Sequence, residues 1–386
     1  MRFEISKVLD AIEGRVCTDP ALARAVLDLA EVVRYTDFDG GRPASMLRLG
    51  IVIDALSRQL EEDSVPVYPV VHRALLSDAD LTSNERMVVR RWADDGLVEV
   101  LPNPVERMLE LADLLGLPVL SRMRFDGMLG RYPWLGSQPG RLLAPVTGAN
   151  GPALVAQAGG GAVWTSPGPS PTGAKLLSRL WRCPEPGCVL FGGGGGGGGG
   201  SFADLARSDR EPGGQPPPTL RSGSPGCPRH DLRLTDAGPR PGTEVLSVRV
   251  GGQVRRRFVV SADRPVTVGR APEESGGIML GQWLSEEARR WISRNHVRFE
   301  LRGGDLVAFD VSTNGSGIRP GGSMDEDERI ALTQQTNRAL RSNDIVELYP
   351  GVQIGRSSNW TSGGVINPTS VMAEAPTMAM RVIERP

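Results

Sequence analysis

The sequence predicts a multidomain protein with an all-α N-terminal region, a small cysteine-containing module and a C-terminal all-β sandwich. Three observations support this order. Apolar residues recur at helical spacing in the first third of the chain, three cysteines and a histidine gather near its middle, and short alternating apolar runs fill the last third. With 386 residues, the chain has room for two or three domains.

Residues 1–130 are predicted to form a helical domain. Asp19 and Pro20 suit a helix cap and first turn, ahead of apolar residues that recur at helical spacing as far as Arg34. Thr82 and Glu85 have the spacing of a capping box. Further helices are predicted over 44–60, 67–77, 82–94 and 104–115.

Within this region, residues 67–100 resemble a winged helix-turn-helix, with a strand over 96–100 as the wing. Such a fold would place Arg86, Arg90 and Asn84 near DNA. Carboxylates crowd the same segment, which favours a protein partner over nucleic acid. DNA is therefore kept as an alternative partner.

Glycine and proline, 49 and 31 residues in all, are concentrated between roughly residues 136 and 242. Residues 131–178 show few periodic segments and are predicted to be a flexible linker. The end of the chain, 357–386, is polar and sparse in apolar residues, so it is predicted to be a disordered tail.

A candidate metal site lies in the module predicted over 179–240. Cys183 and Cys188 form one closely spaced pair, and Cys227 and His230 form another. Short spacings of this kind let a turn bring two ligands to one face of a tetrahedral ion. The cluster resembles a zinc ribbon with a Gly/Pro-rich insertion, and this resemblance implies a structural zinc whose four protein ligands leave no place for substrate. Unpaired surface thiols are the competing interpretation.

A three-part signature marks the C-terminal third of the chain, and each part falls where a predicted strand gives way to a turn. Loops that carry Arg, Ser, Thr and Asn suit a tetrahedral dianion, because Arg offers forked donors while the hydroxyls and the amide donate singly. The three parts are Gly269-Arg270, Ser293-Arg294-Asn295-His296 and Ser312-Thr313-Asn314-Gly315.

This signature resembles that of the forkhead-associated (FHA) domain, an eleven-stranded β-sandwich that binds phosphothreonine peptides, and it places the domain over 243–356. The resemblance implies that Arg270 forms a salt bridge with the phosphate and that Ser293 donates to a phosphate oxygen. It also implies that Thr313 lies on the phosphate side and that Asn314 bonds the peptide main chain.

The remaining signature residues are expected to support the loops. His296 matches a histidine that braces them without touching ligand, and Gly269 and Gly315 suit turns that a Cβ would strain. Arg294 stands where the family often has Asn. It would either add a second cation to the phosphate or meet an acidic residue elsewhere on the peptide.

Composition supports a soluble bacterial protein. Lys7 and Lys175 are the only lysines, and arginine together with Ala, Gly and Pro indicates a high-GC coding sequence of actinobacterial type. Residues 243–302 carry eleven arginines and seven carboxylates, a local net charge of +4 in a chain of net charge −1. No signal peptide or apolar span is present, so a cytoplasmic location without membrane contact is expected.

The predicted function is that of a phosphothreonine-binding adaptor in serine/threonine kinase signalling, with phosphorylated target proteins as partners. An enzyme is not expected, because the glycine run lacks the Lys-Ser/Thr of a nucleotide loop and no other catalytic set is found. The alternative is a phosphorylation-responsive transcription regulator that binds DNA through its N-terminal region. A scaffold within a defence or secretion system is a third interpretation.

Overall fold

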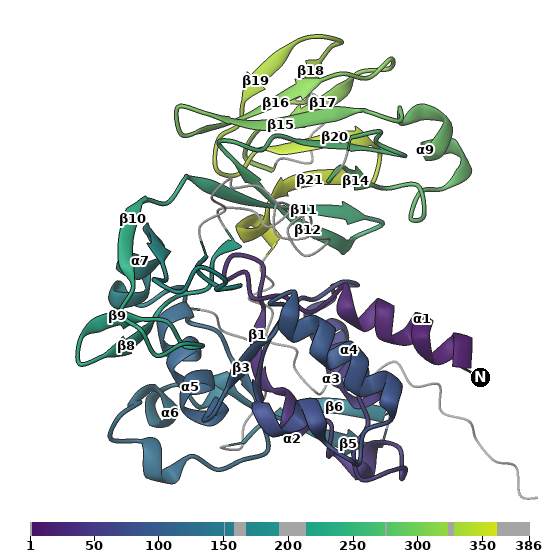
Figure 1. Cartoon of the computed structure of the whole chain (residues 1–386). Coiled ribbons are helices and arrows are strands. Elements are labelled where there is room, and N and C mark those ends of the chain that lie inside the picture. The colour runs from purple at the N-terminus through teal and green to yellow at the C-terminus, as the bar shows by residue number, and fades with distance from the viewer. Residues whose placement is uncertain are drawn as a thin grey trace, which may run out of the picture.

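The structure, a computed structural model, describes residues 2–149, 151–157, 167–192, 214–274, 276–322 and 328–360. In Figure 1 the C-terminal sandwich lies above an N-terminal α/β unit, and the cysteine module lies at the left beside them. Most of the glycine run and the tail from 361 onward lie outside the described residues.

The N-terminal region is built on a parallel β-sheet, so the predicted all-α fold is wrong. The sheet has the strand order β3-β2-β1-β4-β5-β6, in which β1 to β5 are parallel and β6 pairs antiparallel with β5. Its strands are β1 (Ala25–Asp28), β2 (Val67–His72), β3 (Glu99–Leu101), β4 (Val119–Leu120), β5 (Leu142–Gly148) and β6 (Gly151–Ala156).

Helices cover both faces of this sheet (Figure 1). Successive residues of β1 point to opposite sides, because Ala25 and Leu27 belong to one apolar core and Val26 to the other. The first core includes residues of α1 (Arg2–Glu13), α3 (Leu47–Leu60) and α4 (Ser83–Asp94). The second includes residues of α5 (Pro104–Leu115) and the short α6 (Trp134–Ser137), whereas α2 (Leu29–Val32) follows β1 directly.

The all-α prediction failed at strands that are buried on both faces. Such strands read as continuous apolar runs without alternation, which periodicity cannot distinguish from buried helix. The predicted helix over 67–77 is strand β2 followed by a 3-10 turn at Arg73–Ser77, and the helix expected before Arg34 is strand β1 followed by the short helix α2. The helices predicted over 44–60, 82–94 and 104–115 are confirmed as α3, α4 and α5.

The winged helix-turn-helix is wrong for the same reason, since its expected wing is β3 of the parallel sheet. The arginines assigned to DNA are bonded within the protein. Arg86 donates to the carbonyl oxygens of Asp78 and Leu81, and Arg90 donates to the carbonyl of Leu76. Asn84 lies in the first turn of α4.

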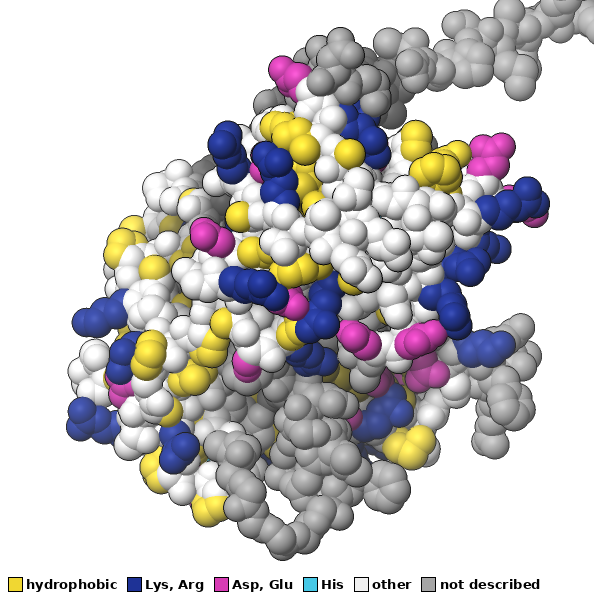
Figure 2. Space-filling view, turned by 90° about the horizontal axis from the view of Figure 1, so that it is seen from above, with side chains coloured by type: hydrophobic (Ala, Val, Ile, Leu, Met, Phe, Trp, Pro, Cys, Tyr) yellow, Lys and Arg dark blue, Asp and Glu magenta, His cyan; other side chains and the backbone are white. Residues whose placement is uncertain are grey.

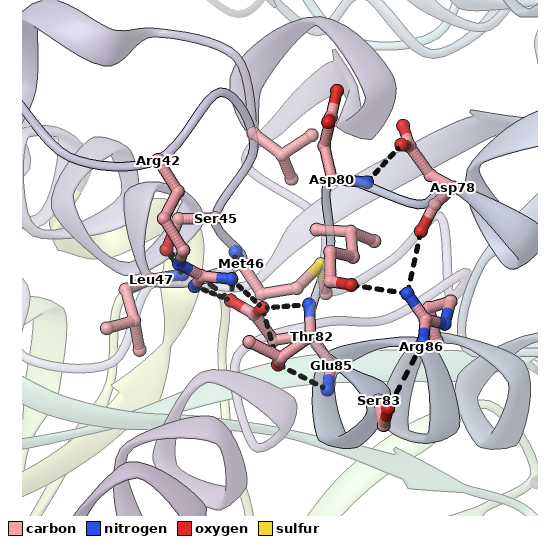
Figure 3. A network of polar contacts seen from close by, with 12 residues as sticks. Arg42, Ser45, Met46, Leu47, Asp78, Asp80, Thr82, Ser83, Glu85 and Arg86 are labelled. Atoms are coloured by element: carbon pink, nitrogen blue, oxygen red, sulfur yellow. Dashed lines mark hydrogen bonds and ion pairs between the residues drawn. The ribbon is translucent and has the colours of Figure 1, made fainter.

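Figure 3 shows how one buried carboxylate joins the N-terminal ends of α3 and α4. Glu85 and Thr82 form the predicted capping box. The Glu85 carboxylate accepts a hydrogen bond from each terminal nitrogen of Arg42, both at 3.0 Å. It also accepts one from the backbone N–H of Met46 at 3.0 Å. Burial by itself raises the pKa of Glu85, but the bonds from Arg42 and Thr82 outweigh it and lower the pKa to about 2.

This carboxylate should make the protein sensitive to acid. Because the folded pKa of Glu85 lies below its unfolded value, its contribution to stability is complete above the ordinary glutamate pKa and is lost as the pH falls towards about 2. Glu85→Gln should therefore lower stability at neutral pH and flatten its dependence on pH in the acid range. Urea unfolding of both proteins across that range measures the effect, and parallel stability profiles would contradict it.

The segment 131–178, predicted as a flexible linker, contains α6, β5, β6 and α7 (Pro171–Leu177), with 150 and 158–166 outside the described residues. Helix α7 packs directly on α5. A Cβ on Gly173 would lie 1.9 Å from the carbonyl oxygen of Leu114, so only glycine permits this contact. Small residues in this segment allow close packing, so the Gly- and Pro-rich composition that suggested a linker was misleading.

The cysteine module consists of two small antiparallel pairs. Strand β7 (Arg179–Arg182) pairs with β10 (Thr235–Pro239), and β8 (Thr219–Arg221) pairs with β9 (Ser224–Gly226). Its apolar cluster is formed by three cysteines with Leu190, Phe191 and Leu234. A core of this size is small for a module that folds without further support.

Residues 243–356 form the predicted all-β sandwich. Among the described residues, it has eleven strands in two sheets, of orders β12-β11-β21-β20-β17-β18 and β14-β13-β15-β16-β19, around one apolar core. The strands are β11 (Thr243–Val250), β12 (Gln253–Ser261), β13 (Val266–Gly269), β14 (Ile278–Met279), β15 (Val297–Arg302), β16 (Asp305–Asp310), β17 (Ser316–Arg319), β18 (Ile330–Leu332), β19 (Asn337–Ala339), β20 (Ile345–Tyr349) and β21 (Val352–Arg356).

Two further elements belong to the sandwich. Between the first two signature parts lies the short helix α9 (Glu286–Trp291). After β21, Ser357–Trp360 forms a 3-10 turn against β11 and β21, so the start of the predicted disordered tail is ordered. The rest of that tail, and residues 323–327, lie outside the described part of the chain.

The sandwich packs on the α/β unit through a buried ion pair. Glu62, just after α3, accepts from Arg257 of β12 at 2.9 and 2.6 Å, and both side chains are at least nine-tenths buried. Arg24 joins the same carboxylate at 3.3 Å, and the N–H of Asp63 donates to the carbonyl of Val254 at 2.9 Å. These contacts join the two units directly.

Candidate functional site

The three signature loops meet at one end of the sandwich. The N–H of Arg270 donates to the carbonyl of Ser293 at 3.0 Å, which joins the end of β13 to the loop before β15. A Cβ on Gly269 would lie 1.9 Å from the carbonyl oxygen of Arg294. Glycine at 269 is therefore required for the two loops to approach this closely.

Ser293 is also bonded to the third loop. Its hydroxyl oxygen accepts the N–H of Thr313 at 3.1 Å, which leaves the hydroxyl hydrogen available to a ligand acceptor. The ring Nδ1 of His296 accepts the N–H of Ser293 at 3.0 Å. His296 is fully buried, and burial lowers its pKa although the Asp310 carboxylate opposes the shift. A neutral imidazole that braces Ser293 is the scaffold role expected of this residue.

Sequence reasoning missed the residue that organises the third loop. The buried carboxylate of Asp310, at the end of β16, accepts from the N–H and hydroxyl of Ser312 at 2.9 and 2.8 Å and from the hydroxyl of Ser316 at 2.6 Å. Ser312 in turn accepts the N–H of Gly315 at 2.8 Å, where φ is +78°. A strand-ending Asp two residues before Ser is the signal that could have identified it.

Helix α9 lies between the first and third loops. A guanidinium nitrogen of Arg270 donates to the carbonyl of Arg289 at 3.4 Å, and the Asn314 amide donates to the carbonyl of Trp291 at 2.7 Å. These carbonyls belong to the last turn of the helix, where no intrahelical donor is available. The helix therefore positions two of the predicted binding residues.

Arg294 has a partner within the domain, since its guanidinium lies 3.0 Å from the carboxylate of Glu273. Both side chains are about two-thirds exposed, so this ion pair is weak and open to exchange. The N–H of Glu273 donates to the side chain of Asn295 at 3.2 Å. The cation of Arg294 is directed to Glu273, and its two predicted roles toward a peptide stay predictions.

Figure 2 looks down on the sandwich end of the molecule. Basic side chains gather along its right-hand margin, the side on which Figure 1 places α9, with acidic side chains among them. Arg270, Arg289, Arg290 and Arg294 are all exposed. A loop rim of this composition offers charged donors to an anion from more than one direction.

The structure also brings Cys183, Cys188, Cys227 and His230 together. All four donor atoms lie within 4.8 Å of one another. The Sγ atoms of Cys188 and Cys227 are 3.8 Å apart, and His230 Nδ1 is 3.5 Å from Cys183 Sγ and 3.6 Å from Cys227 Sγ. Donors at about 2.3 Å from a tetrahedral zinc would be separated by about 3.8 Å, so the group fits such an ion.

The surroundings favour thiolate at Cys188, whereas burial raises the pKa of Cys183 and the hydrogen bond to Cys188 raises that of Cys227. The pKa of Cys188 is lowered to about 5, chiefly because the Cys227 thiol donates to it, and the N–H of Phe191 donates to the same sulfur at 3.3 Å. A sulfur that accepts such bonds is a good metal ligand. The three cysteines are buried, so the competing interpretation that they are surface thiols is wrong.

Besides the signature loops and the cysteine cluster, polar side chains gather at the carboxyl end of the parallel sheet. They lie between β1 and β4, where the strand order reverses. Burial raises the pKa of Asp28 to about 6 while its carboxylate accepts the N–H of Ala30 at 2.9 Å. Arg122 follows β4, donates to Asp37 at 2.7 and 2.8 Å and lies 4.0 Å over the ring of Tyr35. Open α/β sheets bind ligands at the point where the strand order reverses, and here the Arg122 side chain is held by Asp37 and Tyr35.

Known proteins resemble this chain in structure alone. No family model matches the chain, and no curated protein matches it. Similar solved structures include the FHA domain of MEK1, at 17% identity, 29% coverage of this chain and 86% of the other, and a TM-score of 0.22. The FHA domain of human APLF in complex with an XRCC1 bisphospho peptide has 18% identity, 29% and 97% coverage and a TM-score of 0.22. The FHA domain of the CT664 protein from Chlamydia trachomatis has 18% identity, 29% and 94% coverage and a TM-score of 0.22.

Within the described ranges, no helix combines the length and apolar character needed to cross a bilayer.

Proposed function

We propose that the chain is a phosphothreonine-binding adaptor that captures phosphorylated protein segments at the signature loops. The observation that carries this proposal is the contact of the Thr313 N–H with the Ser293 hydroxyl oxygen, next to Arg270 on the adjoining loop. It joins the residues predicted to hold a phosphate into one rim. A phosphate ester carries about −1.5 to −2 charges at neutral pH and accepts several charge-assisted hydrogen bonds.

Each residue has a defined part in this proposal. Arg270 supplies the cation, Ser293 and Thr313 donate from their hydroxyls, and Asn314 uses its second amide hydrogen for the peptide main chain, since Trp291 takes the first. Arg294 reaches an oxygen only by leaving Glu273. Arg270 therefore contributes the largest share of phosphate recognition.

The chain would act through occupancy, without chemistry of its own. A serine/threonine kinase modifies a partner in the cytoplasm, the loops bind the modified segment, and the α/β unit and cysteine module are brought to that partner. The direct ion pairs between the sandwich and the α/β unit support joint recruitment of these parts. Affinity in the micromolar range corresponds to about −8 kcal/mol.

A phosphothreonine peptide array tests this proposal. Arg270→Ala should weaken binding to every phosphorylated peptide by about 30-fold to 5,000-fold, which corresponds to about 2–5 kcal/mol. Arg302→Ala is the matched control, because Arg302 is an exposed arginine at the opposite end of β15 and should leave binding unchanged. Equal losses in the two variants would contradict the assignment to the loops.

We further infer that the Cys3His group holds a structural zinc ion. Cys183, Cys188, Cys227 and His230 supply four protein ligands, which complete a tetrahedral site and leave no open position. The zinc would stabilise a module whose own apolar core is small.

A further inference from the structure

Helix α9 is fastened to the phosphate-binding loops by its last turn. The carbonyl of Arg289 accepts from Arg270 at 3.4 Å, and the carbonyl of Trp291 accepts from Asn314 at 2.7 Å. At the other end of the helix, the side chain of Ser285 accepts the N–H of Ala288 at 3.2 Å. The helix is thereby held in place along the rim.

Packing determines which way α9 faces. Ala288 of α9 is buried in the core of the sandwich, as are Leu284 before the helix and Ile292 after it. Trp291 lies off this face and is 46% exposed. Of the six tryptophans in the described residues, the other five are buried or half-buried, so Trp291 alone is presented to solvent.

An exposed indole next to binding residues contributes little to folding. Tryptophan side chains bury about 150–250 Å² when packed, and they are enriched where one protein binds another. Val311, beside the third loop, is also exposed, at 44%, and its N–H donates to the carbonyl of His296. Two apolar side chains therefore border the loops that carry the polar donors.

We propose that Trp291 is a specificity-determining residue, which selects phosphothreonine segments that carry an apolar side chain near the phosphorylated residue. This inference rests on the proposed phosphopeptide function. An extended peptide bonded to Asn314 would lie beside Trp291, because the Asn314 amide donates to the carbonyl of that residue at 2.7 Å. Side chains two positions apart in an extended chain face the same way, about 6–7 Å from each other, so a flanking residue reaches the indole while phosphothreonine stays at Arg270.

The test uses the full chain and phosphothreonine peptides in which each flanking position is in turn serine or leucine. The wild-type protein should prefer leucine at one position by about ten-fold, which corresponds to about 1.4 kcal/mol. Trp291→Ala should abolish this preference while keeping dependence on phosphate, and Trp291→Phe should restore most of it. Met87→Ala, which removes an exposed apolar side chain from α4, is the control and should change nothing.

The outcomes separate this inference from the proposed function. Preference for leucine that survives in Trp291→Ala overturns the role of Trp291, and so does a wild-type protein that binds phosphopeptides without preference at any position. Binding that ignores phosphate in every variant overturns the proposed function itself, and this inference with it.

Discussion

Removal of the proposed zinc ion should unfold the cysteine module. Structural zinc contributes about 10–16 kcal/mol to the folding of small domains near neutral pH. Among the described residues of this module, a cluster of six buried apolar or cysteine residues is available to replace that contribution. Three buried thiols without an ion would also repel one another as they ionise. Chelation followed by hydrogen exchange should show rapid exchange in β7 to β10, whereas the sandwich core stays protected.

Cys227→Ser should reproduce the effect of chelation, because Cys227 is fully buried within the cluster. Cys17→Ser is the matched control, since Cys17 lies near β2 in the α/β unit and outside the cluster. Metal content measured on each protein should fall from one equivalent to none in the first variant only. A wild-type protein that is fully protected from exchange with no bound metal would refute the structural role.

Arg107→Ala should cause the largest loss of stability among single substitutions in the α/β unit. The Arg107 side chain is buried on α5, and it donates to Glu99 at 2.8 and 3.0 Å and to Glu110 at 2.7 Å. It also donates to the carbonyls of Pro217 and Pro218, at 2.5 and 3.3 Å. Its removal leaves two carboxylates short of a partner, of which Glu99 is fully buried, and such uncompensated charge costs about 3–5 kcal/mol.

An exposed arginine that pairs with the same helix supplies the control for this prediction. Arg131 forms an ion pair with Glu106 of α5, but both side chains are at least one-third exposed, so Arg131→Ala should cost at most about 1 kcal/mol. Denaturant unfolding monitored by far-UV circular dichroism compares the two. Limited proteolysis should cut Arg107→Ala faster before β8, because the contact with Pro217 and Pro218 is lost. Equal midpoints for the two variants would show that the buried cluster does not stabilise the fold.

The sandwich, and the proximity of the residues in each candidate site, could be predicted from the sequence because each rests on local patterns. Alternating apolar residues mark strands with one exposed face, and the spacing of Cys183 to Cys188 suffices to bring two ligands together. The signature loops fall at strand ends, where Arg270 and Ser293 were expected and are found side by side. Asp310 escaped notice because its role depends on three hydrogen bonds that form only in the folded loop.

The N-terminal unit was not predictable in the same way. Strands β1 and β2 lie inside a parallel sheet, so both of their faces are apolar and the period of two disappears. The long-range pairing of Val26 with Tyr68 and Val119 is what makes these segments strands. The glycine content of 131–178 suggested a flexible linker, but Gly173 is needed for the contact of α7 with α5. Packing between distant segments decided both cases.

The packing of the three parts also changes the expected mode of action. A tethered adaptor would let each module move freely, whereas Glu62 and Arg257 join the sandwich to the α/β unit, and Arg107 joins the cysteine module to the same unit. Ligand bound at the loops is therefore held at a defined position relative to the α/β unit. Partners of the α/β unit would be positioned against the captured phosphoprotein.

The most direct test of the central claim is calorimetric titration of the full chain with one peptide in two forms, threonine and phosphothreonine. We expect micromolar binding of the phosphorylated form, no measurable heat from the unmodified form, and binding of the phosphorylated form that is weakened at least about 30-fold by Arg270→Ala. Equal binding of the two peptides by the wild-type protein would contradict it.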